Sequence, residues 1–130
     1  MEQNLDISVV VPLYNEEESL PELVEWIDRV ARTNNLTYEI IMVDDGSTDR
    51  SWAVVEELKA KYSTIRGMSF MRNYGKSAAL YCGFDMARGE VVFTMDADLQ
   101  DSPDEIPEMR RMILEEDYDI VSGWKRKRHD

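Results

Sequence analysis

Two aspartates spaced one residue apart, Asp96 and Asp98, follow directly on the apolar run 91–95. An uninterrupted apolar, β-branched run is typical of a parallel strand that is buried on both faces. Ligands of open α/β sheets bind beyond the carboxyl ends of such strands, so we expect the two carboxylates at a binding crevice. A turn after Asp96 would let both converge on one hard divalent cation. The pair fits two solvated loop acids equally well, so the pattern alone leaves both interpretations open.

Two further apolar runs end in polar groups in the same way. The run 39–43 leads into the aspartates 44–45, and the run 7–11 leads into the segment 12–16, which contains Tyr14. The carboxyl ends of parallel strands meet at one edge of a sheet. We therefore expect the acids and the tyrosine to line a single crevice.

Helical patterns separate these strands. Apolar spacing predicts a helix over about 20–31, beginning with a capping box formed by Ser19 and Glu22. Ser47 or Thr48 is predicted to cap a second helix. The inner face of that helix is predicted to consist of Trp52, Val55, Leu58 and Tyr62.

The second half of the chain continues the alternation. Residues 68–71 are predicted to form a weak strand. Small residues over about 76–87 predict a helix that packs closely on the sheet, with Gly89 as its terminator. The segment 102–105 predicts the capped start of another helix, and residues 118–122 predict a last strand.

Alternating strands and helices predict one α/β domain over residues 1–130. Right-handed crossovers should give a mainly parallel sheet with helices on both faces. The chain stops soon after the strand predicted over 118–122, in a basic, turn-like end over 124–130. No helix follows to cover that strand, so we expect that more protein originally followed.

Composition narrows the classes of function. The chain carries 15 basic and 27 acidic residues, a formal net charge of −12, whereas a general nucleic-acid binder needs a basic face. The single cysteine, Cys82, cannot form an internal disulfide, which favours a reducing, cytoplasmic compartment. No apolar run reaches the roughly 18 residues of a membrane span, so we expect membrane contact only through segments absent from this chain.

Four motifs follow one another along the chain: 10–16, 43–49, 72–76 and 96–103. With these motifs the sequence resembles the inverting family 2 glycosyltransferases, and most closely those of the dolichol-phosphate mannose type, which transfer sugars to polyprenyl phosphate. The resemblance implies a GT-A (Rossmann-like) fold, truncated at the C-terminus, that binds a UDP-sugar or GDP-sugar donor. A homo-oligomer is also compatible with it.

The resemblance also implies a metal site. Mg²⁺ or Mn²⁺ would be held by Asp98, with help from Asp96 and Gln100, and would stabilise the departing nucleoside diphosphate as a Lewis acid. Asp96 and Asp98 are catalytic in this sense, and no general base is evident. The residues expected to contact the nucleotide are Pro12, Leu13, Tyr14, Glu16, Asp44, Asp45, Lys76, Asp96, Ala97, Asp98 and Lys125.

The chemistry of individual residues agrees with this assignment. Asp44 can accept hydrogens from uracil or guanine, and Tyr14 offers a flat apolar face beside a base. Lys76 and Arg72, near a predicted helix N-terminus, can add positive charge toward phosphates. Lys125 stands where this family usually has arginine, and it supplies a point charge without a bidentate fork.

Several functions stay open at this point. A polyprenyl phosphate acceptor is already an anion and needs no general base, so it agrees with the missing base and would place the full protein at the cytoplasmic face of the membrane. A saccharide acceptor, as in polysaccharide or cell-wall synthesis, is the alternative, with its base outside this chain. A non-catalytic nucleotide-binding module and a phosphohydrolase of the haloacid-dehalogenase type are two further alternatives.

Overall fold

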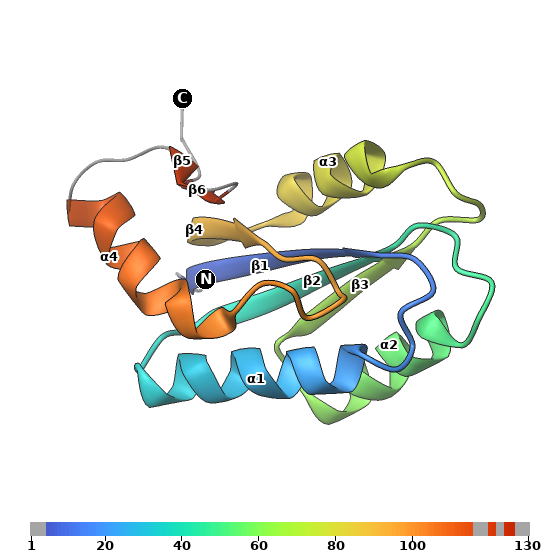
Figure 1. Ribbon diagram of the computed structural model, residues 1–130, viewed down its shortest axis with the longest axis horizontal. Helices are drawn as coiled ribbons and strands as arrows, with labels where there is room; N and C mark the ends of the chain where they lie inside the picture. The colour runs from blue at the N-terminus through green and yellow to red at the C-terminus, as the bar shows by residue number, and fades with distance from the viewer. Residues whose placement is uncertain (1–4, 116–119, 122–123, 127–130) are drawn as a thin grey trace.

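The computed structural model describes residues 5–115, 120–121 and 124–126 (Figure 1). The first part of the chain forms β1 (Leu5–Leu13), α1 (Leu20–Thr33), β2 (Tyr38–Asp44), α2 (Ser51–Lys61) and β3 (Ile65–Ser69). The second part forms α3 (Lys76–Met86), β4 (Gly89–Thr94), the short 3-10 helix η1 (Pro103–Glu105), α4 (Ile106–Glu115), β5 (Ile120–Val121) and β6 (Trp124–Arg126). Among the described helices, none has both the length and the apolar character needed to cross a bilayer.

The strands form one sheet in the order β3-β2-β1-β4-β6-β5. The first four are parallel to one another, whereas β6 is antiparallel to β4 and β5 is antiparallel to β6. This confirms the mainly parallel sheet. The carboxyl ends of β1, β2 and β4 share one edge, at Leu13, Asp44 and Thr94.

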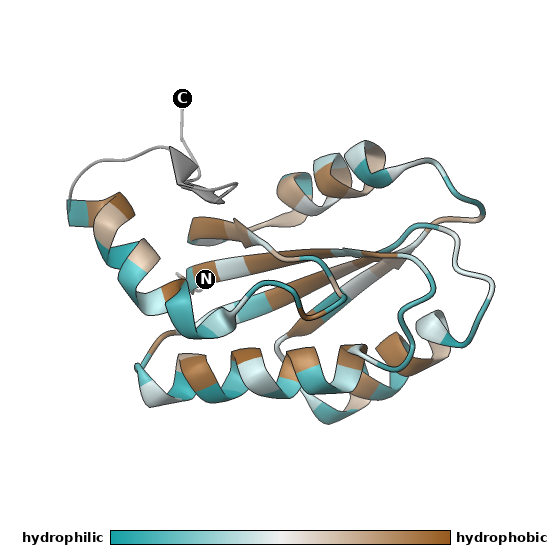
Figure 2. Cartoon of the chain, in the orientation of Figure 1, coloured by the Kyte–Doolittle hydropathy of each residue, from teal (hydrophilic) through white to brown (hydrophobic). Residues whose placement is uncertain are grey.

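Helices cover both faces of the sheet, as predicted. In Figure 1, α1 and α2 lie on one side and α3 on the other. Successive strand residues point to opposite faces, and so Val9 and Val11 pack in the core beneath α1, α2 and α4, while Val10 packs in the core beneath α3. Figure 2 shows the hydrophobic side of α1 turned toward the sheet.

Small residues let α3 approach the sheet closely. A Cβ atom on Gly83 would lie 2.3 Å from Cγ1 of Val10, which agrees with the close packing predicted from the sequence. The helix predicted over about 76–87 is observed as α3, which ends at Met86, but Gly89 does not terminate it and instead begins β4. A side chain at Gly89 would meet the backbone of Ile7 at 2.5 Å, so glycine is needed there for strand packing.

Both predicted helix caps in the first half were wrong. Ser19 forms no side-chain cap at α1, because its hydroxyl bonds to another loop. Neither Ser47 nor Thr48 caps α2, which begins later, at Ser51, where Oδ1 of Asp49 accepts the Ser51 N–H at 2.8 Å. In the second half, the hydroxyl of Ser102 does accept the Asp104 N–H, but it caps the 3-10 turn η1, and α4 follows.

Strand boundaries also differ from the prediction. β3 spans Ile65–Ser69 and not 68–71, because its residues pair in register with β2 from Ile40 onward. The basic end predicted as turn-like contains β6, which pairs along the second edge of β4 and so satisfies backbone groups there. Of the predicted strand 118–122, residues 120–121 form β5 and the others lie outside the described residues.

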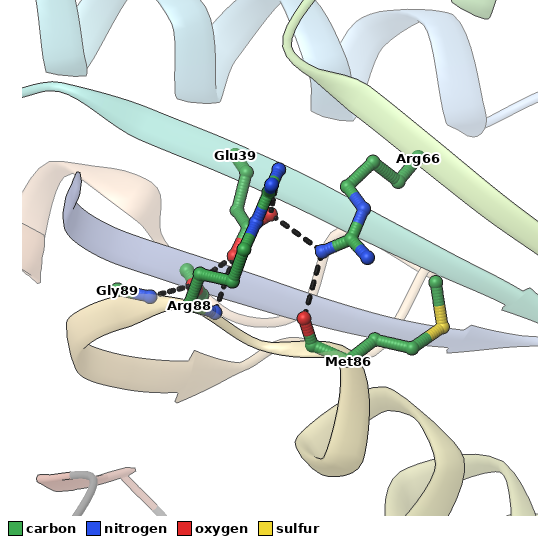
Figure 3. Close-up of polar contacts among 6 residues, drawn as sticks. Glu39, Arg66, Met86, Arg88 and Gly89 are labelled. Carbon is green, nitrogen blue, oxygen red and sulfur yellow. Dashed lines mark hydrogen bonds and ion pairs between the residues drawn. The ribbon is translucent and has the colours of Figure 1, made fainter. Parts of the chain in front are cut away.

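A buried carboxylate joins four segments at the opposite end of the sheet (Figure 3). Glu39 on β2 accepts hydrogen bonds from Oγ of Ser8 at 2.6 Å, the backbone N–H of Arg88 at 2.7 Å and the Arg66 guanidinium at 2.9 Å. Burial acts to raise the pKa of Glu39, but these hydrogen bonds outweigh it and hold the pKa below its ordinary value. Arg66 also donates to the Met86 carbonyl, so the cluster anchors the end of α3.

Candidate functional site

A cleft of about 310 Å³ opens where β1, β2 and β4 end. Residues from all four sequence motifs meet in it, and one of them, Lys76, is the first residue of α3. The lining residues are Pro12, Leu13, Tyr14, Glu16, Asp45, Lys76, Asp96, Ala97 and Asp98. The single crevice expected from the strand ends is therefore present, and it brings together nine of the residues expected to contact a nucleotide.

The two aspartates of the Asp-x-Asp pair lie on a tight turn after β4. The Asp96 N–H donates to Oδ2 of Asp101 at 3.4 Å, and the Gln100 N–H donates to Oδ1 of Asp98 at 3.2 Å. Leu99 adopts a left-handed backbone with φ of 67°, which is uncommon for a leucine. Asp98 is exposed and Asp96 is half-buried, so both carboxylates are accessible from the cleft.

A basic residue faces this turn from the start of α3. Nζ of Lys76 lies 2.6 Å from Oδ1 of Asp96, and both side chains are partly exposed. The ion pair joins the β3–α3 loop to the end of β4. A cation at this position can neutralise either the carboxylate or a phosphate group in the cleft.

The β3–α3 loop is held by the loop that follows β2. The carboxylate of Asp45 accepts the Tyr74 N–H at 2.7 Å and the Gly75 N–H at 3.1 Å. Gly46 has φ of 77°, and a Cβ atom on it would lie 2.3 Å from the backbone carbon of Arg72. These contacts fix the loop that ends at Lys76, a supporting role for Asp45 that the sequence did not reveal.

Asn15 is a second residue whose role sequence reasoning missed. Its Oδ1 accepts the Thr48 N–H at 2.8 Å and the Asp49 N–H at 3.2 Å, while its own N–H donates to Ser47. The backbone of Asn15 is left-handed, with φ of 53°. Asparagine tolerates this conformation better than most residues, and its place between Tyr14 and Glu16 is the only sequence signal.

Among the described side chains, three expected site residues do not line the cleft, and a fourth expected residue, Lys125, is not tested. Asp44 is only 1% exposed, and its Oδ1 accepts the Ser47 N–H at 2.9 Å. Gln100 is exposed at the end of the turn, and Arg72 is exposed with its guanidinium 5.2 Å from the centre of the Tyr74 ring. The backbone of Lys125 belongs to β6, but its side chain lies outside the described part of the chain.

The acids of the cleft fit a divalent ion that is shared with a ligand. Across the described residues, no three His, Cys, Asp or Glu side chains cluster closely enough to hold a metal by themselves. Asp96 and Asp98 nevertheless offer carboxylate oxygens to the same cleft. Mg²⁺ is usually bound by one or two carboxylates, with phosphates and waters completing its coordination. The two aspartates are therefore a suitable protein share of such a site.

Sequence comparisons find relatives over nearly the whole of this chain. Residues 8–130 match the model of the family described as glycosyl transferase family 2. A protein of Proteus mirabilis (strain HI4320) named undecaprenyl-phosphate 4-deoxy-4-formamido-L-arabinose transferase is 43% identical over 125 residues, covering 95% of this chain and 38% of that protein. Its namesake from Pseudomonas fluorescens (strain SBW25) is 42% identical, with 95% and 36% covered. The chain thus spans less than two fifths of these curated relatives.

Solved structures share the fold. S. aureus TarS 1-349 superposes with a TM-score of 0.72 at 25% identity, covering 88% of this chain and 34% of that one. The mannosyltransferase PcManGT from Pyrobaculum calidifontis, solved in complex with GDP-Man and Mn²⁺, gives a TM-score of 0.72 at 24% identity, covering 85% and 33%. The GT-A fold expected from the sequence is confirmed.

Proposed function

Because this chain belongs to glycosyl transferase family 2, we propose that it forms the donor-binding part of an inverting enzyme that transfers a sugar from a nucleoside diphosphate to polyprenyl phosphate. The observation that carries the proposal is the cleft in which Asp96, Asp98 and Lys76 meet an aromatic ring, Tyr14. Carboxylates for a metal, a cation for phosphate and a flat ring for a base are the groups that such a donor requires.

The nucleoside is proposed to bind between the ends of β1 and β2. Tyr14 is 45% exposed and offers a ring face to the base, and Asp45 lines the same cleft. A carboxylate has about four acceptor positions, so Asp45 can hold the N–H groups of Tyr74 and Gly75 and still accept a hydrogen from uracil or guanine. We assign this contact to Asp45 in preference to Asp44, which is buried and does not line the cleft.

The diphosphate is proposed to bind at the end of β4. Asp98, with Asp96, would hold Mg²⁺ or Mn²⁺, which supplies Lewis-acid stabilisation to the leaving diphosphate when bound. Lys76 can turn its ammonium group from Asp96 to a phosphate oxygen within the same cleft. Gln100 is exposed and does not line the cleft, so a ligand role for it needs a rearrangement of the turn.

Polyprenyl phosphate is the proposed acceptor because its transfer reaction requires no general base from this chain. A phosphate oxygen of the acceptor attacks the anomeric carbon, the bond from that carbon to the donor diphosphate breaks, and the electron pair leaves with the diphosphate. The acceptor oxygen is already anionic, so no general base is needed. The names of the relatives from Proteus mirabilis and Pseudomonas fluorescens also contain undecaprenyl phosphate. The full-length protein would then act at the cytoplasmic face of the membrane.

A transfer assay with the full-length protein tests this proposal. Radiolabelled UDP-sugars and GDP-sugars are offered with polyprenyl phosphate or with saccharide acceptors, and label is followed into the lipid and saccharide fractions. We expect metal-dependent label in the lipid fraction, and its loss in Asp98→Asn. Label found only in saccharide would overturn the lipid acceptor, and the absence of transfer to either acceptor would contradict the enzyme assignment.

A further inference from the structure

The hydroxyl of Ser19 connects α1 to the Asp-x-Asp turn. Ser19 occupies the position before α1 but forms no side-chain cap there. Its Oγ lies 2.5 Å from the carbonyl oxygen of Ala97, and 3.2 Å from Oε2 and 3.3 Å from the carbonyl oxygen of Glu16. A hydroxyl has one hydrogen to donate, and the shortest of these contacts directs it to Ala97.

A hydrogen bond to the Ala97 carbonyl can affect the orientation of the neighbouring aspartates. It stands between the two aspartates, is 3% exposed and lines the cleft. Its carbonyl belongs to the peptide plane that leads into Asp98, so holding that oxygen restricts the direction in which the Asp98 side chain leaves the backbone.

The turn itself needs support from outside. Two of its hydrogen bonds, from the N–H groups of Asp96 and Gln100, are made to side chains of the same turn. Leu99 adopts the left-handed region, a conformation that persists in a non-glycine residue when surrounding contacts hold it. The bond from Ser19 ties this strained segment to a helix whose inner face is buried in the core.

We infer that Ser19 is a positioning residue of the metal and diphosphate site, acting through the Ala97 carbonyl to hold Asp98 toward the cleft. The inference rests on the proposed function of the Asp-x-Asp pair. Glu16 contacts the same hydroxyl and lines the same cleft, so the exits of β1 and β4 are joined through one side chain.

If Ser19 only stabilised the fold, Ser19→Ala would lower stability without a specific loss of metal affinity. Ser8 provides the matched control. Its buried hydroxyl donates to Glu39 at 2.6 Å and accepts the Gly89 N–H at 2.7 Å, at the opposite end of the sheet. Ser8→Ala removes a hydrogen-bonded serine hydroxyl, as Ser19→Ala does, but leaves the Asp-x-Asp turn untouched. A loss of stability alone should therefore affect both variants, and a loss of metal affinity only one.

The experiment measures Mn²⁺ affinity in the full-length protein with saturating UDP or GDP, by the electron paramagnetic resonance signal of free Mn²⁺. We expect Ser19→Ala to raise the Kd for Mn²⁺ about tenfold, and Ser19→Thr and Ser8→Ala to change it less than twofold. Amide hydrogen exchange of residues 96–101 without metal should become faster in Ser19→Ala and stay unchanged in Ser8→Ala. Ser19→Cys, a weak donor of similar size, should raise the Kd at least threefold if the alanine variant does not fold.

The outcomes separate the two proposals. Wild-type protein that binds Mn²⁺ with nucleotide, together with a Ser19→Ala Kd within twofold of it, would overturn the role of Ser19 and leave the proposed function standing. An equal loss of affinity in Ser8→Ala would also overturn it, because the effect would then reflect stability. Wild-type protein that binds no Mn²⁺ with either nucleotide would remove the proposed function, and the inference with it.

Discussion

The ammonium group of Lys76 lies 2.6 Å from Oδ1 of Asp96, so one carboxylate of the Asp-x-Asp pair already forms an ion pair with a lysine of the same chain. Lys76 begins α3 and Asp96 follows β4, and both residues line the cleft. A divalent ion that takes Asp96 as a ligand must displace the lysine, and a diphosphate arriving with the ion offers the lysine a new partner.

If Lys76 exchanges Asp96 for the diphosphate, Lys76→Met should change the affinity for Mn²⁺ and the affinity for nucleotide in opposite directions. Affinity for Mn²⁺ without nucleotide should rise by up to about fivefold, because a partly exposed ion pair contributes roughly 0.2 to 1 kcal/mol. Affinity for UDP or GDP should fall about tenfold, because a charge-assisted bond to phosphate is lost. Calorimetric titrations measure both. Lys59→Met, which removes a lysine from the last turn of α2 that does not line the cleft, is the control and should change neither affinity. A fall in both affinities would contradict the exchange.

Asp45 and Asp44 are predicted to differ in their effects on binding. Asp45→Ala should weaken nucleoside diphosphate binding by about 1 to 3 kcal/mol, because it removes the acceptor in the cleft and the partner of the Tyr74 and Gly75 N–H groups. Asp44→Ala should instead lower the free energy of unfolding by about 1 to 2 kcal/mol, because its buried carboxylate holds the Ser47 N–H. Titration with UDP, GDP, ADP and CDP and urea unfolding test this pair. A larger loss of affinity in Asp44→Ala would restore the assignment made from sequence.

Gly46, which follows Asp45 and touches the backbone of the β3–α3 loop, should not tolerate a side chain without a loss of stability. Gly46→Ala would place a Cβ atom 2.3 Å from the Arg72 backbone, in addition to the strain of φ at 77°. Gly75→Ala adds a comparable backbone strain at φ of 103°, but no atom lies within 4 Å of its Cβ. We expect losses of unfolding free energy of about 3 kcal/mol for Gly46→Ala and about 1 to 2 kcal/mol for Gly75→Ala. Equal losses in chemical denaturation would show that the close approach is relieved at little cost.

Glu39 is predicted to make stability depend on pH at the end of the sheet away from the cleft. Its pKa is lower in the folded chain than its ordinary value of 4.5, so the unfolded chain binds the proton more readily. The stabilisation is present above about pH 4.5 and is lost as the pH falls through the lower, folded pKa. Glu39→Gln should cost about 2 to 3 kcal/mol at pH 7 and reduce the dependence on acid pH.

Urea unfolding of both proteins at pH 7 and at pH 4 checks the Glu39 prediction. Nucleotide affinity at pH 7 should stay unchanged in Glu39→Gln, because the nearest described contacts of Glu39 are with Ser8, Arg66 and Arg88. An identical pH dependence in the two proteins would assign the acid sensitivity to other carboxylates.

The sequence predicted the elements whose signals are periodic and local. Parallel strands and amphipathic helices follow from apolar spacing, and the cleft follows from three strands that end in polar residues. The role of Ser19 could not be predicted, because a serine before a helix is most often a cap and its partner Ala97 is 78 positions away. The pairing of β6 could not be predicted, because this basic segment forms a strand through pairing with β4 and β5, which its own residues do not reveal.

The central claim is that the cleft binds a nucleoside diphosphate together with a divalent ion held by Asp98. Calorimetric titration of UDP and GDP into the full-length protein, with Mn²⁺ and with chelator, tests it most directly. The account predicts that Mn²⁺ raises the affinity for the preferred nucleotide at least tenfold, and that Asp98→Asn, which keeps the shape of the side chain, abolishes this gain. Equal nucleotide affinity with and without Mn²⁺, or an undiminished gain in Asp98→Asn, would contradict it.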